Sequence, residues 1–129
     1  MDFEESREVG AAPEIIWRLV SDRQRLAEWV PTTAFSQPAG EDSVQLRGES
    51  HGHAYDTRGG FVVDDATRTL SWDSPRHSGY QGVLTVTGSG AGSRVTVRVT
   101  ITDLPPGVGR ELTRGLGETL DRIDQLTRA

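Results

Sequence analysis

The chain has 129 residues, the size of one ordinary domain, and we expect residues 1–129 to form a single domain. Its formal net charge of −5 makes it a poor candidate for nucleic-acid binding, and the absence of cysteine excludes disulfides and thiolate metal sites. No apolar run approaches the ~18–20 residues of a membrane span, and the acidic N-terminus lacks signal-peptide features, so we expect a cytoplasmic protein.

The N-terminal part predicts one strand and two short helices. Residues 2–9 form a strand candidate. Pro13 occupies the favoured first position of a helix, and apolar residues recur at helical spacing from there to Val20. Asp22 is then placed to cap a second short helix over residues 23–29.

Period-two alternation dominates residues 34–103. The clearest example runs from Val95 to Ile101, where every second side chain is apolar. Weaker alternation indicates further strands, and the glycine-rich segment 88–93 indicates a hairpin loop. These patterns predict about five antiparallel strands here, and about six to seven in the whole sheet. The weaker alternating segments are residues 44–49, 55–63, 70–72 and 80–87.

A long helix is predicted from about Val108 to Arg128, because apolar residues follow one face at spacings of three and four. Gly115 and Gly117 lie inside it, where each costs about 1 kcal/mol relative to alanine. Close packing is the commoner explanation for such glycines, and room for a ligand is the other.

The order of these elements predicts an α+β helix-grip fold. A run of antiparallel strands has one face to bury, and a helix of about twenty residues is ~30 Å long, enough to cross it. We therefore expect a curved antiparallel sheet wrapped around the C-terminal helix, with two short helices after the first strand. Such an arrangement tends to leave a cavity between sheet and helix.

Three segments carry a resemblance to a known superfamily. Residues 12–22 (APEIIWRLVSD) and 25–31 (RLAEWVP) resemble the opening of the START-like, Bet v 1-like superfamily (SRPBCC), and residues 111–123 resemble the closing helix of its polyketide cyclase/dehydrase-like branch. The resemblance runs along essentially the whole chain. It implies the helix-grip fold, but the superfamily includes lipid carriers, hormone receptors, aromatases/cyclases and Hsp90 co-chaperones, so function has to be argued from the site.

Strand parity predicts which side chains face the cavity. If Val95 and Val97 point inward, the inner set is mostly apolar with a few hydroxyl groups, which suits a hydrophobic or aromatic ligand held by one or two hydrogen bonds. The alternative is that these side chains simply fill the core, which is the commoner role for any one of them. The ligand-binding candidates are Tyr55, Thr57, Phe61, Trp72, Tyr80, Leu84, Leu112 and Leu116.

Charged groups supply the weaker candidates for chemistry. Parity from Val9 places Glu5 and Arg7 on the inner face, where with Tyr55 they are candidate catalytic residues or a site for a phenol or carboxylate. A frayed or bulged strand would instead turn both outward. The pair His51 and His53 has a zinc-like spacing, with His77 elsewhere, but solvated turn histidines are the favoured interpretation. No metal or other cofactor is expected.

Three functions compete. The first and favoured is an intracellular protein that binds a hydrophobic or aromatic small molecule, with no nucleic-acid or membrane partner. The second is a metal-free aromatase/cyclase-like enzyme using the same cavity. The third is an Hsp90-activator-like interaction protein; that branch usually has a tryptophan in its last helix, whereas Trp17, Trp29 and Trp72 all precede it here. Monomer and homodimer both stay open.

Overall fold

The computed structural model describes residues 2–31, 33–50, 53–73, 80–102 and 108–128. These residues form seven strands and three helices in the order β, α, α, six β, α. The elements are β1 (Asp2–Val9), α1 (Pro13–Val20), α2 (Leu26–Trp29), β2 (Thr33–Pro38), β3 (Ser43–Ser50), β4 (His53–Asp64), β5 (Thr69–Asp73), β6 (Gln81–Ser89), β7 (Gly92–Thr100) and α3 (Val108–Thr127).

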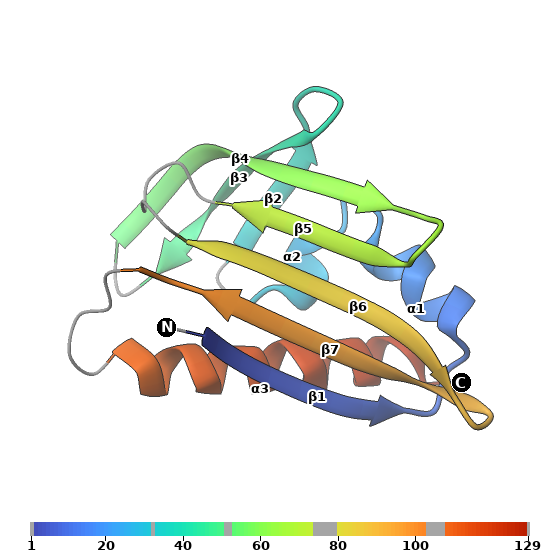
Figure 1. Ribbon diagram of the computed structural model, residues 1–129. Coiled ribbons are helices and arrows are strands. Elements are labelled where there is room, and N and C mark those ends of the chain that lie inside the picture. The colour runs from blue at the N-terminus through green and yellow to red at the C-terminus, as the bar shows by residue number, and fades with distance from the viewer. Residues whose placement is uncertain (1, 32, 51–52, 74–79, 103–107, 129) are drawn as a thin grey trace.

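The strands form one antiparallel sheet in the order β1-β7-β6-β5-β4-β3-β2. The consecutive strands β1 and β2 are thus its two edges, and α1 and α2 lie on the connection between them. Figure 1 shows α3 along the inner face of the curved sheet, beside β1 and running in the same direction. The predicted helix-grip fold is confirmed, with its long C-terminal helix and its two short helices after the first strand.

The sheet bends within β4, whose first part pairs with β3 and whose last part pairs with β5. Gly59 and Gly60 lie at the change of partner, where the strand turns in Figure 1. The Gly60 N–H donates a hydrogen bond of 3.0 Å to Asp73 Oδ1, and a Cβ on Gly60 would stand only 2.7 Å from that oxygen. Glycine therefore leaves room for the Asp73 carboxylate at this close approach.

The core lies between the middle of the sheet and the C-terminal half of α3. Val95, Val97 and Val99 are each no more than 1% exposed, which confirms the inward face predicted from period-two alternation. Side chains from the sheet and from all three helices meet them, so the sheet and the helices share one apolar core. The other members that are 0–1% exposed are Ile16 and Val20 of α1, Val44, Leu70 and Leu84 of the sheet, and Leu120 and Ile123 of α3.

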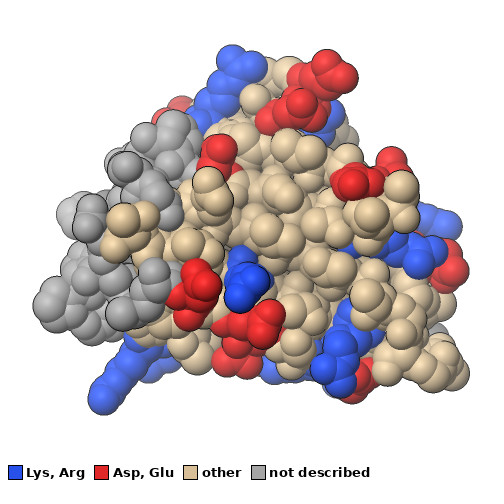
Figure 2. All heavy atoms as spheres, viewed as in Figure 1, with Lys and Arg blue, Asp and Glu red and all other residues tan. Residues whose placement is uncertain are grey.

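On the outer face of the sheet, the middle strands β4 to β6 carry mostly uncharged side chains. Figure 2 shows them as a broad area with acidic and basic side chains scattered around it. Val62 and Val83 are exposed there, in line with Ser71 across the strands. This alternation of buried and exposed side chains is typical of an antiparallel sheet with one solvated face.

The second helix is shorter than predicted. It begins at Leu26, not at residue 23, because Asp22 is used in a local turn instead of a helix cap. Asp22 Oδ1 accepts a hydrogen bond of 2.9 Å from the Gln24 N–H, and the Asp22 carbonyl accepts one of 3.0 Å from the Arg25 N–H. A side chain that bonds its own backbone two residues on favours a turn over a helix.

Two details of the sheet also differ from the prediction. The loop expected over residues 88–93 is only the turn Gly90-Ala91, with Gly90 at a φ of +58° that glycine adopts readily. The strand β2 has no clear period-two signal, because its pairing with β3 shifts register between Thr33 and Phe35. Such an irregularity breaks the alternation by which strands are recognised.

Candidate ligand-binding site

Hydroxyl groups line the inner face where β2, β3 and β4 run beyond the core. Gly48 of β3 pairs with Thr33 of β2 on one side and with Tyr55 of β4 on the other. Tyr55 Oη and Thr33 Oγ1 are 3.1 Å apart and share a hydrogen bond. Thr33 is 7% exposed, whereas Tyr55 and its inner-face neighbour Thr57 are partly exposed. The pair therefore places an oriented phenol at the margin of the core.

The start of α2 is tied to this region through a buried serine. Ser36 Oγ accepts a hydrogen bond of 3.2 Å from the Leu26 N–H, which holds α2 against β2. Trp29, three residues along, is 3% exposed, and its indole N–H has no acceptor within the described residues. A buried donor left unpaired costs about 1–3 kcal/mol. Sequence periodicity did not single out Trp29 as a functional residue, because an unpaired N–H leaves no trace in an apolar pattern.

Trp72 and Tyr80 form a second aromatic unit. The Trp72 indole covers Gly82, its partner across the strands, so closely that a Cβ on Gly82 would overlap the ring. Its N–H donates a hydrogen bond to the Tyr80 hydroxyl. Burial raises the pKa of Tyr80 above its usual value, and the hydrogen bond from Trp72 opposes part of that rise. Both side chains are partly exposed.

The eight predicted ligand-binding residues divide into two groups. Phe61, Leu84 and Leu116 are 4%, 0% and 8% exposed and belong to the packed core. The others keep partial exposure, so they have surface left for a ligand. These are Tyr55, Thr57, Trp72, Tyr80 and Leu112.

The two glycines of α3 face unfilled space. A Cβ built on Gly115 or on Gly117 meets no heavy atom within 4 Å, although both residues are partly buried. Close packing, the explanation that the sequence favoured, therefore does not account for either glycine. Leu112, one turn before Leu116 on the buried face of α3, is also only partly buried. The N-terminal half of α3 thus covers the sheet less tightly than its C-terminal half.

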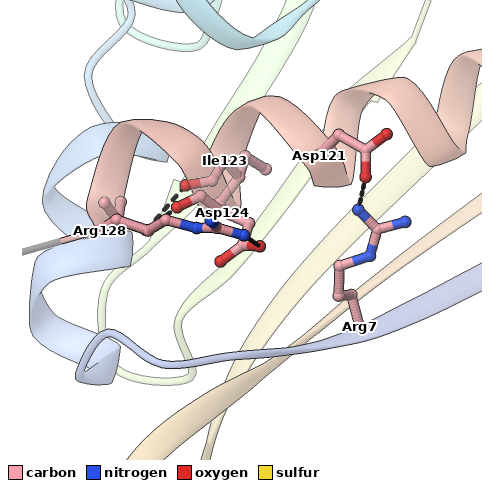
Figure 3. A network of polar contacts seen from close by, with 6 residues as sticks. Arg7, Asp121, Ile123, Asp124 and Arg128 are labelled. Carbon is pink, nitrogen blue, oxygen red and sulfur yellow. Dashed lines mark hydrogen bonds and ion pairs between the residues drawn. The ribbon is translucent and has the colours of Figure 1, made fainter.

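Glu5 and Arg7 lie on the inner face, as parity predicted. Their partners across the strands are Val97 and Val95, both buried, so β1 neither frays nor bulges there. Arg7 forms an ion pair with Asp121 of α3 (Figure 3). The strands β7, β6 and β5 separate β1 from Tyr55 on β4, so the three candidate catalytic residues do not form one cluster.

A groove of about 440 Å³ lies elsewhere, at the corner between the start of α1 and the end of α3. Its polar side includes Asp124 and Arg128, which form an ion pair of 2.8 Å (Figure 3). The ligand-binding candidates do not line this groove. The lining residues are Gly10, Ala11, Ala12, Ile15, Asp124, Thr127 and Arg128.

A metal site needs several ligating side chains close together. No group of three or more histidine, aspartate or glutamate side chains is suitably placed within the described parts of the chain. His51 and His77 lie outside the described residues, as does the side chain of His53. Across the three described helices, none has the length and hydropathy of a membrane span.

Comparison with known families settles the relationship that the motifs indicated. Residues 1–125 match the family described as polyketide cyclase / dehydrase and lipid transport. The chain belongs to this family. The START-like, Bet v 1-like resemblance is thereby confirmed. A search of curated proteins gave no match.

Solved structures agree on the fold at low identity. The KanY protein has a TM-score of 0.78 at 16% identity, with 100% of this chain and 98% of that chain covered. A START superfamily protein from Mycobacterium smegmatis has a TM-score of 0.73 at 16% identity, with 96% and 92% covered. The di-domain ARO/CYC BexL from the BE-7585A biosynthetic pathway has a TM-score of 0.77 at 19% identity. The match includes 97% of this chain but only 45% of the BexL chain, so this chain spans about half the length of BexL.

Proposed function

We propose that the chain binds a hydrophobic, aromatic small molecule between the sheet and the N-terminal half of α3. The observation that carries this proposal is the change along the inner face from fully buried aliphatic side chains to partly exposed aromatic and hydroxyl side chains. Gly115 supports the same position from the helix, because its Cβ site is empty. An apolar lining with a few polar groups is typical of small-molecule sites.

The polar groups suggest what the molecule carries. The buried Trp29 N–H lacks an acceptor within the described residues, and a ligand carbonyl would supply one. The hydroxyls of Tyr55 and Thr33 can each donate or accept a hydrogen bond. We therefore favour a fused aromatic ring system bearing a ketone or quinone oxygen over a simple fatty acid. The family description, which joins polyketide cyclases with lipid transport, includes both classes.

A titration with dihydroxyanthraquinone and with palmitate tests this function. We expect the quinone to quench tryptophan fluorescence saturably and to bind more tightly than palmitate. Trp29→Phe keeps an aromatic side chain, although a smaller one, and removes the N–H, so it should weaken quinone binding by roughly tenfold, the value of one buried hydrogen bond. Absence of saturable binding by either molecule would contradict the proposed function.

Filling the empty helix position gives a second, steric test. Gly115→Leu should weaken quinone binding by at least about tenfold, because the new side chain occupies the proposed site. Arg114→Leu is the matched control, since it adds the same side chain at an exposed position one residue away. Equal binding by both variants would place the ligand elsewhere.

A second candidate function is cyclisation of a poly-β-ketone, as in an aromatase/cyclase. It is favoured by the oriented hydroxyl pair of Tyr55 and Thr33, because cyclisation needs a shaped site and a group that transfers protons. With a synthetic poly-β-ketone thioester as substrate, Tyr55→Phe should reduce turnover by a larger factor than it weakens quinone binding. Arg7→Ala should reduce turnover less, because β7, β6 and β5 separate Arg7 from Tyr55. Unchanged turnover in Tyr55→Phe would exclude this role for the pair.

A further inference from the structure

We call the line of contact between β1 and α3 the seam, and an ion pair crosses it. Figure 1 shows the two elements side by side and running in the same direction. In Figure 3 Arg7 reaches from the inner face of β1 to Asp121 on the adjacent flank of α3, where the two form an ion pair. This contact fixes which residues of the strand and the helix lie opposite each other.

Extrapolated along the strand and the helix from the Arg7–Asp121 contact, the next facing positions are Glu5 and Gly117. Glu5 lies two residues before Arg7 on β1, and at the rise of a strand the two positions are ~6.6 Å apart. Gly117 lies four residues before Asp121 on α3, on the same side of the helix, and at the helical rise the two positions are ~6 Å apart. The next position along the seam therefore pairs a carboxylate on the strand with a helix residue that has no side chain.

Glu5 is the one carboxylate of β1 on the inner face, whereas Asp2, Glu4 and Glu8 are exposed on the outer face. Asp2 and Glu8, on the outer face, are paired with Arg98 and Arg94 of β7. Glu5 is partly buried on the inner face, beside Val97, and has no hydrogen bond or ion pair with any described residue. A carboxylate that is partly removed from water without a donor is unfavourable, and a donor from a ligand would stabilise it.

Open space reaches Glu5 from the helix side. A Cβ on Gly117 would meet nothing within 4 Å, so no protein side chain fills the position across from the carboxylate. On the sheet side, Phe3 precedes Glu5 on the same face and is partly buried. Phe3 begins the cross-strand row that continues through Val99 and Gly82 to Trp72, so Glu5 borders the aromatic part of the inner face.

We propose that Glu5 is a specificity-determining residue that accepts a hydrogen bond from a hydroxyl group on the aromatic ligand, with Gly117 leaving room for the ring that bears it. This inference rests on the proposed binding function and adds the chemistry of a second end of the ligand. The Trp29 N–H supplies a donor and Glu5 supplies an acceptor, so the preferred molecule carries both a carbonyl oxygen and a phenol or alcohol. Arg7 is kept from competing for Glu5 by its ion pair with Asp121.

The test compares β-naphthol with its methyl ether, which has the same rings but cannot donate a hydrogen bond. Each is titrated into the full chain and followed by tryptophan fluorescence and by calorimetry. We expect the unsubstituted chain to prefer the naphthol by roughly tenfold, the usual effect of a hydrogen bond to a charged group. Glu5→Leu should bring the two affinities to within about twofold of each other, and Glu5→Gln should give an intermediate preference.

Glu4→Leu is the matched control, because Glu4 is adjacent on the same strand but exposed on the outer face. It should retain the full preference for the naphthol. Gly117→Leu should weaken both probes, since it fills the seam opposite Glu5. A preference that survives in Glu5→Leu, or that disappears equally in Glu4→Leu, would overturn the role of Glu5 while leaving the binding function intact. If neither probe binds the unsubstituted chain although dihydroxyanthraquinone does, the role of Glu5 is overturned and the binding function stands; if the quinone also fails to bind, both proposals are overturned.

Discussion

The two halves of α3 meet the same sheet in different ways. The C-terminal half places Leu120 and Ile123, which are 1% and 0% exposed, against the aliphatic residues of α1 and the middle strands. The N-terminal half carries the partly exposed Leu112 and the open Gly115 over aromatic and hydroxyl side chains. One helix therefore closes the core at one end and covers a looser region at the other.

This difference separates the residues that stabilise the fold from those that are free to recognise a molecule. Close-packed aliphatic side chains contribute most of the hydrophobic stabilisation, so the other half of the helix is not needed for that purpose. An unpaired donor such as the Trp29 N–H can then persist, because its cost is small beside the stability of the packed end. The comparison predicts distinct responses to substitution at the two ends.

The largest difference is expected between Ile123→Ala and Leu112→Ala. Ile123 is 0% exposed, and its truncation should lower the free energy of unfolding by about 3 kcal/mol. Leu112 is only partly buried, so its truncation should cost about 1 kcal/mol or less. Urea denaturation followed by circular dichroism measures both. Equal losses would mean that α3 is packed alike along its length.

Gly82→Ala tests the boundary between the two regions. The new Cβ would overlap the Trp72 ring, so the indole must move or the strands must separate. We expect a loss of about 1–3 kcal/mol, typical of overpacking, together with a change in tryptophan fluorescence. A variant as stable as the original, with an unchanged spectrum, would show that Trp72 does not lie over Gly82.

Gly115→Ala should have a smaller effect of the opposite sign. Its Cβ meets nothing within 4 Å, so only the gain in helix propensity remains, up to about 1 kcal/mol of added stability. The same denaturation experiment measures it. Destabilisation would show that a neighbouring group already fills this position and would support close packing.

The smallest expected effect is on the stability of the fold at high pH, where Tyr80 ionises. Because burial raises the pKa of Tyr80 in the folded state, its contribution to stability is present below the unfolded pKa of about 10 and is lost as the pH rises above that value. All 14 basic residues are arginines and there are only two tyrosines, so few other groups titrate in this range. Tyr80→Phe should show a shallower loss of stability in alkaline denaturation. Identical alkaline profiles would contradict a buried Tyr80.

Most of the fold follows from patterns that survive in a single sequence. The alternation around Val95 fixes a half-buried strand, and the apolar face of residues 108–128 fixes the long helix, because both periods are imposed by one-sided burial. The short helix after Asp22 was placed too early, since the residue types that cap helices also make local turns. Strand β2 was obscured by its shift of register after Thr33.

The site was predictable only in part. Parity correctly placed Tyr55, Trp72 and Glu5 on the inner face, because each follows the alternation of its strand. Parity does not separate a packed Leu84 from a partly exposed Trp72. Their burial depends on how closely α3 approaches each row of side chains across the strands. The unpaired Trp29 N–H and the ion pair that fixes the α3 register arise from tertiary geometry, which local sequence does not encode.

The three indole N–H groups allow the most direct test of the account. Trp17 donates a hydrogen bond of 2.8 Å to Asp65, whereas the proposed site uses the Trp29 N–H and the partly exposed Trp72. In a nitrogen-15 NMR titration with dihydroxyanthraquinone, the Trp29 and Trp72 indole signals should shift saturably, and the Trp17 signal should stay in place. Shifts confined to Trp17 and the groove residues near Ile15, or no shifts at all, would contradict a site beneath the N-terminal half of α3.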